Sequence, residues 1–363
     1  MRIQILGSIR KHDTTSNMKF DYNTHWVSRH VEDGLLGIER PIIASILKFT
    51  LVWDIIALIF TFLHWESMSL SFVYASALGL FWVNIAPFLI WYYDERVLPG
   101  FFDDLFEIIS DLEERQYLAK KYNNFFAQHR ASVSLLWGGA AIVIVFVSES
   151  ALRAQGMSGS GEIFLWITYA YAGYVGGVLG YGFIGPITTI LLIREVTQYK
   201  LEIDPLHPDG LGGLSTVGYV SVRTTLLYSS GSLFLPLLFY FSSAGGMSSV
   251  IFVIAGIYVL SILISFIYPT AIVNRRAQEY RDSILEDLRQ QYIEIEENMD
   301  VPQVDDVTEL NRRLELQRLQ KKYENYDSVN LYPFQLSVLT RLAGSIILPI
   351  LFMLIEIYLP DII

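Results

Sequence analysis

The sequence predicts an all-helical protein that crosses a membrane several times. Of its 363 residues, 52% are hydrophobic and 14% are aromatic, and the mean hydropathy is +0.39. A water-soluble domain with a polar exterior rarely has this composition. Apolar runs of about 20 residues, which are long enough to cross a bilayer core as a helix, recur along the chain. We therefore expect a polytopic helical membrane protein.

About seven apolar segments are expected to form transmembrane helices. They cover residues 41–64, 68–93, 132–150, 163–193, 220–244, 248–272 and 334–359. Lys and Arg concentrate before the first span, between the second and third, and between the sixth and seventh, whereas the alternate connections are nearly free of them. The positive-inside rule then places the N-terminus and the charged loops in the cytoplasm. An odd number of spans places the C-terminus outside.

This topology divides the chain into a cytoplasmic N-terminal segment, six spans with their connections, a cytoplasmic helical hairpin and a last span. The bounds of these parts are 1–40, 41–272, 273–332 and 333–363. Within the second part we expect a cytoplasmic helix at 101–130 and a cytoplasmic loop at 195–219. The localisation that follows is a cell membrane crossed several times.

The hairpin is predicted by two stretches with apolar residues at three-and-four spacing. Pro302 separates the two stretches and ends the first helix. Val307, Leu310 and Leu314 mark the apolar positions of the returning helix, so the two helices are expected to pack as an antiparallel, coiled-coil-like pair.

Composition excludes several function classes. The chain has no cysteine, which excludes disulfides, thiol nucleophiles and Cys-ligated zinc. Its formal net charge of −11 disfavours nucleic acid as a partner, because nucleic-acid binding needs clustered positive charge. The expected partners are the lipid bilayer, further copies of the chain, and a small ion or small-molecule ligand.

The loop "IDPLHPDGLGGL" between two apolar runs allows two interpretations. Asp204, His207 and Asp209 offer carboxylate and imidazole groups within six residues, and with one more ligand they would hold a divalent ion in the 203–213 loop. The alternative is a structural turn, in which prolines fix the backbone and Gly212 and Gly213 provide positive φ before the next helix. No other cofactor is indicated.

The stretch "TVGYV" at 216–220 is similar to a potassium-filter sequence but lacks the last glycine. A Pro/Gly turn precedes it on the predicted cytoplasmic side, where a filter would need a short pore helix and an extracellular location. We do not expect a filter here.

Polar residues inside the apolar segments are the candidate transport residues. Asp54 lies near the middle of the first span, where an ionised carboxylate costs roughly 2.5–3.5 kcal/mol on the insertion scale. Asn84 adds a polar group to the second span. Ser337, Arg341 and Ser345 lie at i, i+4 and i+8 on one face of the last span. Such residues either line a water-filled path or hold helices together.

The fourth span carries glycines at small-xxx-small spacing. Gly173, Gly177 and Gly180 predict a face on which another helix approaches closely. Pro186, with its neighbouring glycines, would kink the span and provide a hinge.

The "HPDGLGGL" loop resembles one in uncharacterised multi-pass prokaryotic membrane proteins, a resemblance that implies no activity. In layout alone, the chain is similar to the insect chemoreceptor channels, which are seven-helix tetramers with a pore lined by the last helix. Their Thr-Tyr…Gln-Phe signature is absent, since Pro333-Phe334-Gln335 does not match it. The similarity of layout therefore does not carry the function over.

These observations favour a homo-oligomeric ion channel whose last helix lines the pore and whose cytoplasmic helices assemble and gate it. The first alternative is a proton- or cation-coupled secondary transporter in which Asp54 carries the ion. The second is a metal-dependent membrane enzyme using Asp204, His207 and Asp209, although no catalytic residue is assigned and an enzyme is the less favoured class. A sensor or scaffold without transport is a further alternative.

Overall fold

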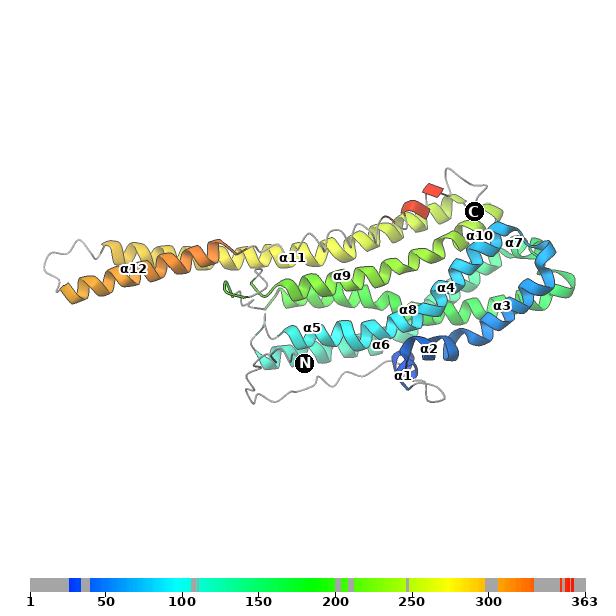
Figure 1. Cartoon of the computed structure of the whole chain (residues 1–363), viewed down its shortest axis with the longest axis horizontal. Coiled ribbons are helices and arrows are strands. Elements are labelled where there is room, and N and C mark those ends of the chain that lie inside the picture. The colour runs from blue at the N-terminus through cyan, green and yellow to red at the C-terminus, as the bar shows by residue number, and fades with distance from the viewer. Residues whose placement is uncertain are drawn as a thin grey trace, which may run out of the picture.

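A computed structural model covers the whole chain, and we describe the parts whose placement is defined. These are residues 26–33, 40–105, 109, 111–199, 204–207, 212–245, 248–297, 306–329, 347, 350–352 and 354–355. All regular elements in these parts are helical, which confirms the predicted all-helical class for them. Figure 1 shows an elongated bundle from which one helical pair projects.

Six helical stretches in the described residues are long and apolar enough to cross a membrane. They are Pro41–Ser67, Leu70–Asp104, Leu112–Val147, Gly159–Val196, Ser215–Phe241 and Phe252–Glu297. These six coincide with the first six predicted spans and fit an integral membrane protein. Most of the predicted seventh span, 334–359, lies outside the described residues, so the number seven and the orientation stay predictions.

The stretches are assembled from shorter elements in several places. The first contains α2 (Pro41–Ser45), a π-helix η1 (Ile46–Thr50), α3 (Leu51–His64) and η2 (Trp65–Ser67). The second contains α4 (Leu70–Tyr92), a second π-helix η3 (Tyr93–Val97) and α5 (Leu98–Asp104). The others contain α6 (Leu112–Val147), η5 (Gly159–Gly161) with α8 (Glu162–Val196), α9 (Ser215–Ser229) with η6 (Ser230–Phe234) and α10 (Leu235–Gly245), and α11 (Ser248–Glu297). Two short helices, α1 (Trp26–Glu32) and α7 (Glu149–Ala154), pack against the ends of the long ones.

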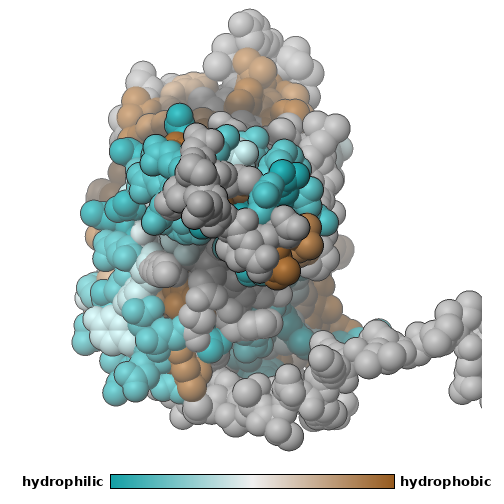
Figure 2. All heavy atoms as spheres, turned by 90° about the vertical axis from the view of Figure 1, so that its left-hand side faces the viewer, coloured by the Kyte–Doolittle hydropathy of each residue, from teal (hydrophilic) through white to brown (hydrophobic). Residues whose placement is uncertain are grey.

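One long helix forms the sixth apolar stretch and continues beyond the bundle. α11 has 50 residues, a length of about 75 Å at 1.5 Å per residue, and α12 (Asp306–Asp327) returns beside its far end (Figure 1). Seen from that end, the described surface is mostly hydrophilic, and hydrophobic residues lie farther back along the bundle (Figure 2). This end therefore suits an aqueous surrounding.

The three apolar residues that mark the returning helix lie within α12 but are exposed. Val307, Leu310 and Leu314 are 62%, 58% and 54% exposed, whereas Leu319 is buried. Leu285 and Leu288 of α11, the helix that α12 contacts, are also buried.

In the range 101–130, for which one cytoplasmic helix is expected, the described residues form the parts of two helices. α5 ends at Asp104, and α6 begins at Leu112 and runs without a break into the third apolar stretch. Asp111 is the N-cap of α6, because its carboxylate accepts hydrogen bonds from the backbone N–H groups of Glu113 (2.7 Å) and Glu114 (3.5 Å). The range 101–130 therefore contains the end of the second apolar stretch, in α5, and the first half of α6.

Candidate functional site

Asp54 lies on α3 as the fourteenth of the 27 residues in the first apolar stretch. Its side chain is half-buried, and in the described structure it makes no ion pair. A carboxylate at this position needs polar neighbours, since ionisation near the centre of an apolar helix costs roughly 2.5–3.5 kcal/mol.

Two neighbouring side chains supply that polarity. The side-chain amide of Asn84 on α4 donates a 3.1 Å hydrogen bond to Oδ1 of Asp54, and a 2.9 Å hydrogen bond to the carbonyl of Leu80. The hydroxyl of Thr50 donates to the amide oxygen of Asn84. Thr50, Asp54 and Asn84, called the Asp54 cluster below, thus join η1 and α3 to α4. Two transport candidates from different predicted spans, Asp54 and Asn84, are in direct contact.

The Asp54 cluster begins at a π-helical turn. In η1 the N–H of Leu51 bonds to the carbonyl of Ile46, five residues earlier. Turns of this kind inside α-helices frequently occur at functional sites. Thr50 is the last residue of this turn and is 2% exposed, so its hydroxyl reaches Asn84 from a buried position.

Helix α8 lies beside the Asp54 cluster. The rings of Trp53 and Tyr171 are 4.9 Å apart between centroids. The buried hydroxyl of Tyr171 has no hydrogen-bond partner among the described groups. A cavity of about 10 Å³ beside Thr50, lined also by Phe49 and Tyr174, has room for roughly one water molecule. The surroundings of the cluster are therefore closely packed on this side.

The arrangement is suited to bind one positive charge. The carboxylate of Asp54 carries one negative charge, which one proton or one monovalent cation would balance. The amide and hydroxyl groups beside it are neutral. Binding would remove the cost of the buried charge, and release would restore it.

The loop that carries Asp204 and His207 folds as a turn in its described part. The carboxylate of Asp204 accepts a 2.9 Å hydrogen bond from the backbone N–H of Leu206. The backbone carbonyl of Asp204 accepts a second one, of 3.1 Å, from the N–H of His207. Gly212 and Gly213 have φ of 67° and 91°, the left-handed region in which glycine is favoured. No group of three metal-ligating side chains occurs among the residues described, but Asp209 lies outside them, so the ion-site prediction is untested.

This turn lies near the base of the hairpin. Burial raises the pKa of Tyr326 on α12, and the neighbouring Tyr280 hydroxyl and Asp204 carboxylate raise it further. The stretch after the turn, "TVGYV", is the beginning of α9 and not an extended filter strand.

The glycines of the fourth span lie along α6. A Cβ atom at Gly176 would lie 2.6 Å from the carbonyl oxygen of Trp137, and one at Gly180 would lie 3.1 Å from that of Val133. At Gly173 it would lie 2.9 Å from the side chain of Ile142, while at Gly177 it would have ordinary contact distances. α8 passes through Pro186 as one continuous helix.

The pore residues expected in the last span, Ser337, Arg341 and Ser345, lie outside the described residues. The channel with a pore lined by this helix stays a prediction, as does the homo-oligomer.

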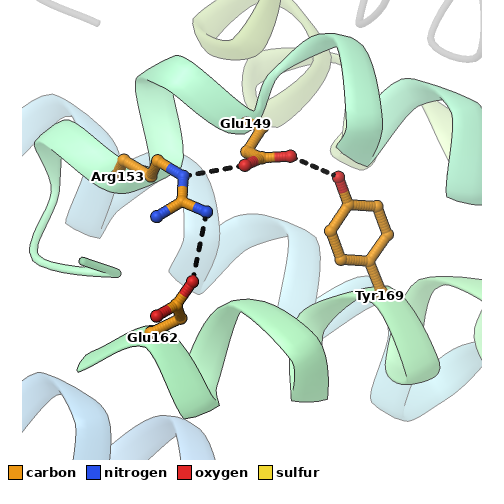
Figure 3. Close-up of polar contacts among 4 residues, drawn as sticks. All are labelled: Glu149, Arg153, Glu162 and Tyr169. Atoms are coloured by element: carbon orange, nitrogen blue, oxygen red, sulfur yellow. Dashed lines mark hydrogen bonds and ion pairs between the residues drawn. The ribbon is translucent and has the colours of Figure 1, made fainter. Parts of the chain in front are cut away.

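A polar cluster lies on α7 and α8 at the end of the bundle opposite the hairpin (Figure 1), and Figure 3 shows its four residues. Arg153 on α7 bridges the carboxylates of Glu149 (2.7 Å) and Glu162 (3.4 Å), and Tyr169 on α8 donates a 2.9 Å hydrogen bond to Glu149. The hydrogen bonds from Arg153 and then from Tyr169 hold the pKa of Glu149 below its ordinary value. The cluster ties α7 to α8.

A second opening lies between α6 and α8 toward the hairpin end. Its volume is about 280 Å³, and Lys121, Tyr122, Phe125 and Arg194 are among its lining residues. Glu195 inside it pairs with Lys121 at 2.6 Å and accepts a 2.9 Å hydrogen bond from Tyr122, so its charge is already matched.

Asp94 on η3 is a buried carboxylate that the sequence did not single out. It lies in "YYDERV", where adjacent charges and tyrosines are typical of a transmembrane helix end at the membrane–water interface. In the structure it is 1% exposed, because α1 folds over it. The polar segment 1–40 gave no signal that a part of it would be buried.

No protein-family model, no curated protein and no solved structure matches the chain.

Proposed function

We propose that this chain is a proton- or cation-coupled membrane transporter in which Asp54 binds the transported ion. The observation that carries the proposal is the hydrogen bond between Asn84 and Asp54 at the middle of two apolar helices. Acidic residues placed inside the membrane commonly mark ion paths and proton relays.

The energetics of the site support coupling. With an ion or proton bound, Asp54 is neutral, and its surroundings of amide, hydroxyl and aromatic groups suit a closed state. Without the ion, the carboxylate is charged and must meet water on one side or the other. The difference, about 2.5–3.5 kcal/mol on the insertion scale, is enough to bias a two-state equilibrium by roughly a factor of 100.

The test is ion movement in proteoliposomes that contain a trapped pH dye or an ion indicator. Gradients of H⁺, Na⁺ or K⁺ are imposed on liposomes with the wild-type chain, with Asp54→Asn and with Asp103→Asn. Asp103 is a matched control because it is exposed on α5. We expect the wild type and Asp103→Asn to dissipate at least one gradient, and Asp54→Asn to leave it standing.

Two results would overturn the proposal. One is wild-type transport by Asp54→Asn, which would show that the carboxylate is dispensable. The other is a folded wild-type protein that moves none of the three ions.

A further inference from the structure

Asp94 has an unusual set of neighbours for a carboxylate. Its Oδ2 atom accepts a 2.6 Å hydrogen bond from the hydroxyl of Ser28, and its Oδ1 atom has no hydrogen-bond partner among the described groups. Both side chains are almost fully buried, with 1% of Asp94 and 0% of Ser28 exposed. An ionised carboxylate in such a place would lose its hydration and gain a single donor in return.

The cover over Asp94 is the short helix α1. Val27 and Val31 turn inward from α1 and are 0% and 1% exposed. The indole N–H of Trp26 donates a 2.5 Å hydrogen bond to the hydroxyl of Tyr181 on α8. A helix of seven residues has little stability of its own. α1 therefore keeps its place through these docking contacts, and the bond from Ser28 to Asp94 is one of them.

The charged groups around Asp94 leave its charge unmatched. On α1, α4, η3, α5 and α9, the elements packed around it, the titratable or charged residues are Arg29, His30, Glu32, Tyr74, Tyr92, Tyr93, Glu95, Arg96, Asp103, Asp104, Tyr219, Arg223 and Tyr228, and Lys48 and Tyr181 bond to α1 from neighbouring helices. None of them is within ion-pair distance of Asp94 in the described structure. Glu95, the next residue in the chain, is a second carboxylate and supplies no positive charge that could pair with Asp94.

We propose that Asp94 is a second proton-binding site, protonated while α1 covers it and deprotonated when α1 lifts. In the covered form Ser28 donates to the carbonyl oxygen of a neutral carboxylic acid. When α1 lifts, the O–H bond of that acid breaks, the proton passes to bulk water, and water hydrates the carboxylate. Rising pH therefore favours the lifted form. This site is separate from the Asp54 cluster, and it stands whether or not Asp54 carries an ion.

The absence of native cysteine makes the lifting measurable. Val31→Cys places the only thiol of the chain on the covered face of α1, and Ser158→Cys places it at an exposed serine far along the chain. The rate of modification by the uncharged reagent N-ethylmaleimide is measured for each purified variant at pH 6 and pH 9. The ratio of the two rates removes the ordinary titration of the thiol.

We expect the ratio of the Val31→Cys rate to the Ser158→Cys rate to rise with pH, by up to about tenfold per pH unit if one proton is released. Asp94→Asn in the Val31→Cys chain should hold the ratio at its low value, since an amide has no proton to lose in this range. A constant ratio between the two pH values would overturn the proposal. So would an equal rise in the Asp94→Asn chain.

Ser28→Ala in the Val31→Cys chain provides a second variant in case Asp94→Asn fails to fold. It removes the donor and keeps the carboxyl, so labelling at pH 6 should become faster than in the parent chain. Unchanged labelling at pH 6 would contradict the role given to the bond from Ser28. Circular dichroism and size-exclusion elution of each variant establish that it is folded.

Discussion

The side-chain amide of Asn84 on α4 donates a hydrogen bond of 3.1 Å to the carboxylate of Asp54 on α3. The two residues lie in different apolar helices, and Thr50 completes the contact from the π-helical turn that precedes α3. The Asp54 cluster is therefore a polar bridge between helices as well as the proposed ion site, and its structural and functional roles can be separated by substitution.

Thr50→Val should destabilise the protein more than Thr61→Val. Both changes replace a hydroxyl with a methyl group of similar size. Each hydroxyl lies within hydrogen-bond distance of a carbonyl four residues earlier, Ile46 for Thr50 and Ala57 for Thr61, but only the Thr50 hydroxyl also contacts a second helix, at the amide oxygen of Asn84. Loss of the Thr50 hydroxyl leaves a half-buried amide oxygen without its donor, which costs about 1–3 kcal/mol. The measurement is the thermal midpoint of each variant in the same detergent, and equal midpoints would contradict the bridge.

Gly176→Ala should loosen the packing of α6 on α8. The added methyl group would lie 2.6 Å from the carbonyl oxygen of Trp137, so the helices must separate, at a cost of about 1–3 kcal/mol. Gly139→Ala is the control, because its Cβ would meet nothing within 4 Å. That change should be neutral or stabilise α6 by up to about 1 kcal/mol through helix propensity. A Gly176→Ala protein with an unchanged thermal midpoint would show that the close contact is not needed.

Glu149 should stabilise the end of the bundle in a pH-dependent way. Because Arg153 and Tyr169 hold its folded-state pKa below the ordinary value, its contribution is complete above about 4.3, the ordinary pKa of Glu. The contribution is lost as the pH falls through the lowered folded-state pKa. We expect Glu149→Gln to lower the thermal midpoint at pH 7, and the difference from the wild type to shrink as the pH falls through the lowered folded-state pKa.

The control for the Glu149 experiment is Glu66→Gln. Glu66 is exposed and makes no ion pair among the described residues. The change in thermal midpoint of Glu66→Gln therefore measures the effect of losing one surface charge. A difference between the wild type and Glu149→Gln that persists at low pH would show that the ionised carboxylate is not the stabilising group.

The predicted orientation can be tested with two matched serines. Ser158 follows α7 and Ser328 follows α12, and both are exposed. In intact cells an impermeant maleimide should label Ser158→Cys, on the predicted outer side, and should reach Ser328→Cys only after permeabilisation. Equal labelling in intact cells would place both on one side and contradict the positive-inside assignment.

The apolar segments could be read from the sequence because length and hydropathy decide them. Which polar side chains of these segments contact one another depends on tertiary packing, and no local sequence pattern indicates it. Asp54 and Asn84 were each identifiable as polar residues in apolar spans, but their pairing depends on the register of α3 against α4. The two π-helical turns, η1 and η3, have no signature in the sequence that we could recognise.

Two features of the structure go beyond the sequence patterns for identifiable physical reasons. The helix expected at 101–130 is interrupted because Asp111 caps α6, and "DLEE" at 111–114 carries that signal in its acidic residues. The burial of Asp94 has no local sequence pattern, because it results from α1, a helix in a segment whose polar composition indicates exposure. The burial of Ser28 in that segment depends on tertiary contacts and has no local signal in the sequence.

The most direct test of the Asp54 site is the initial rate of ion movement in proteoliposomes with Asp54→Glu and Asp54→Asn, compared side by side at equal protein content. If a carboxyl group at this position binds the ion, Asp54→Glu retains transport with a changed apparent affinity, and Asp54→Asn has none. Equal rates for the two variants would contradict the assignment, because the charge-bearing group would then make no difference.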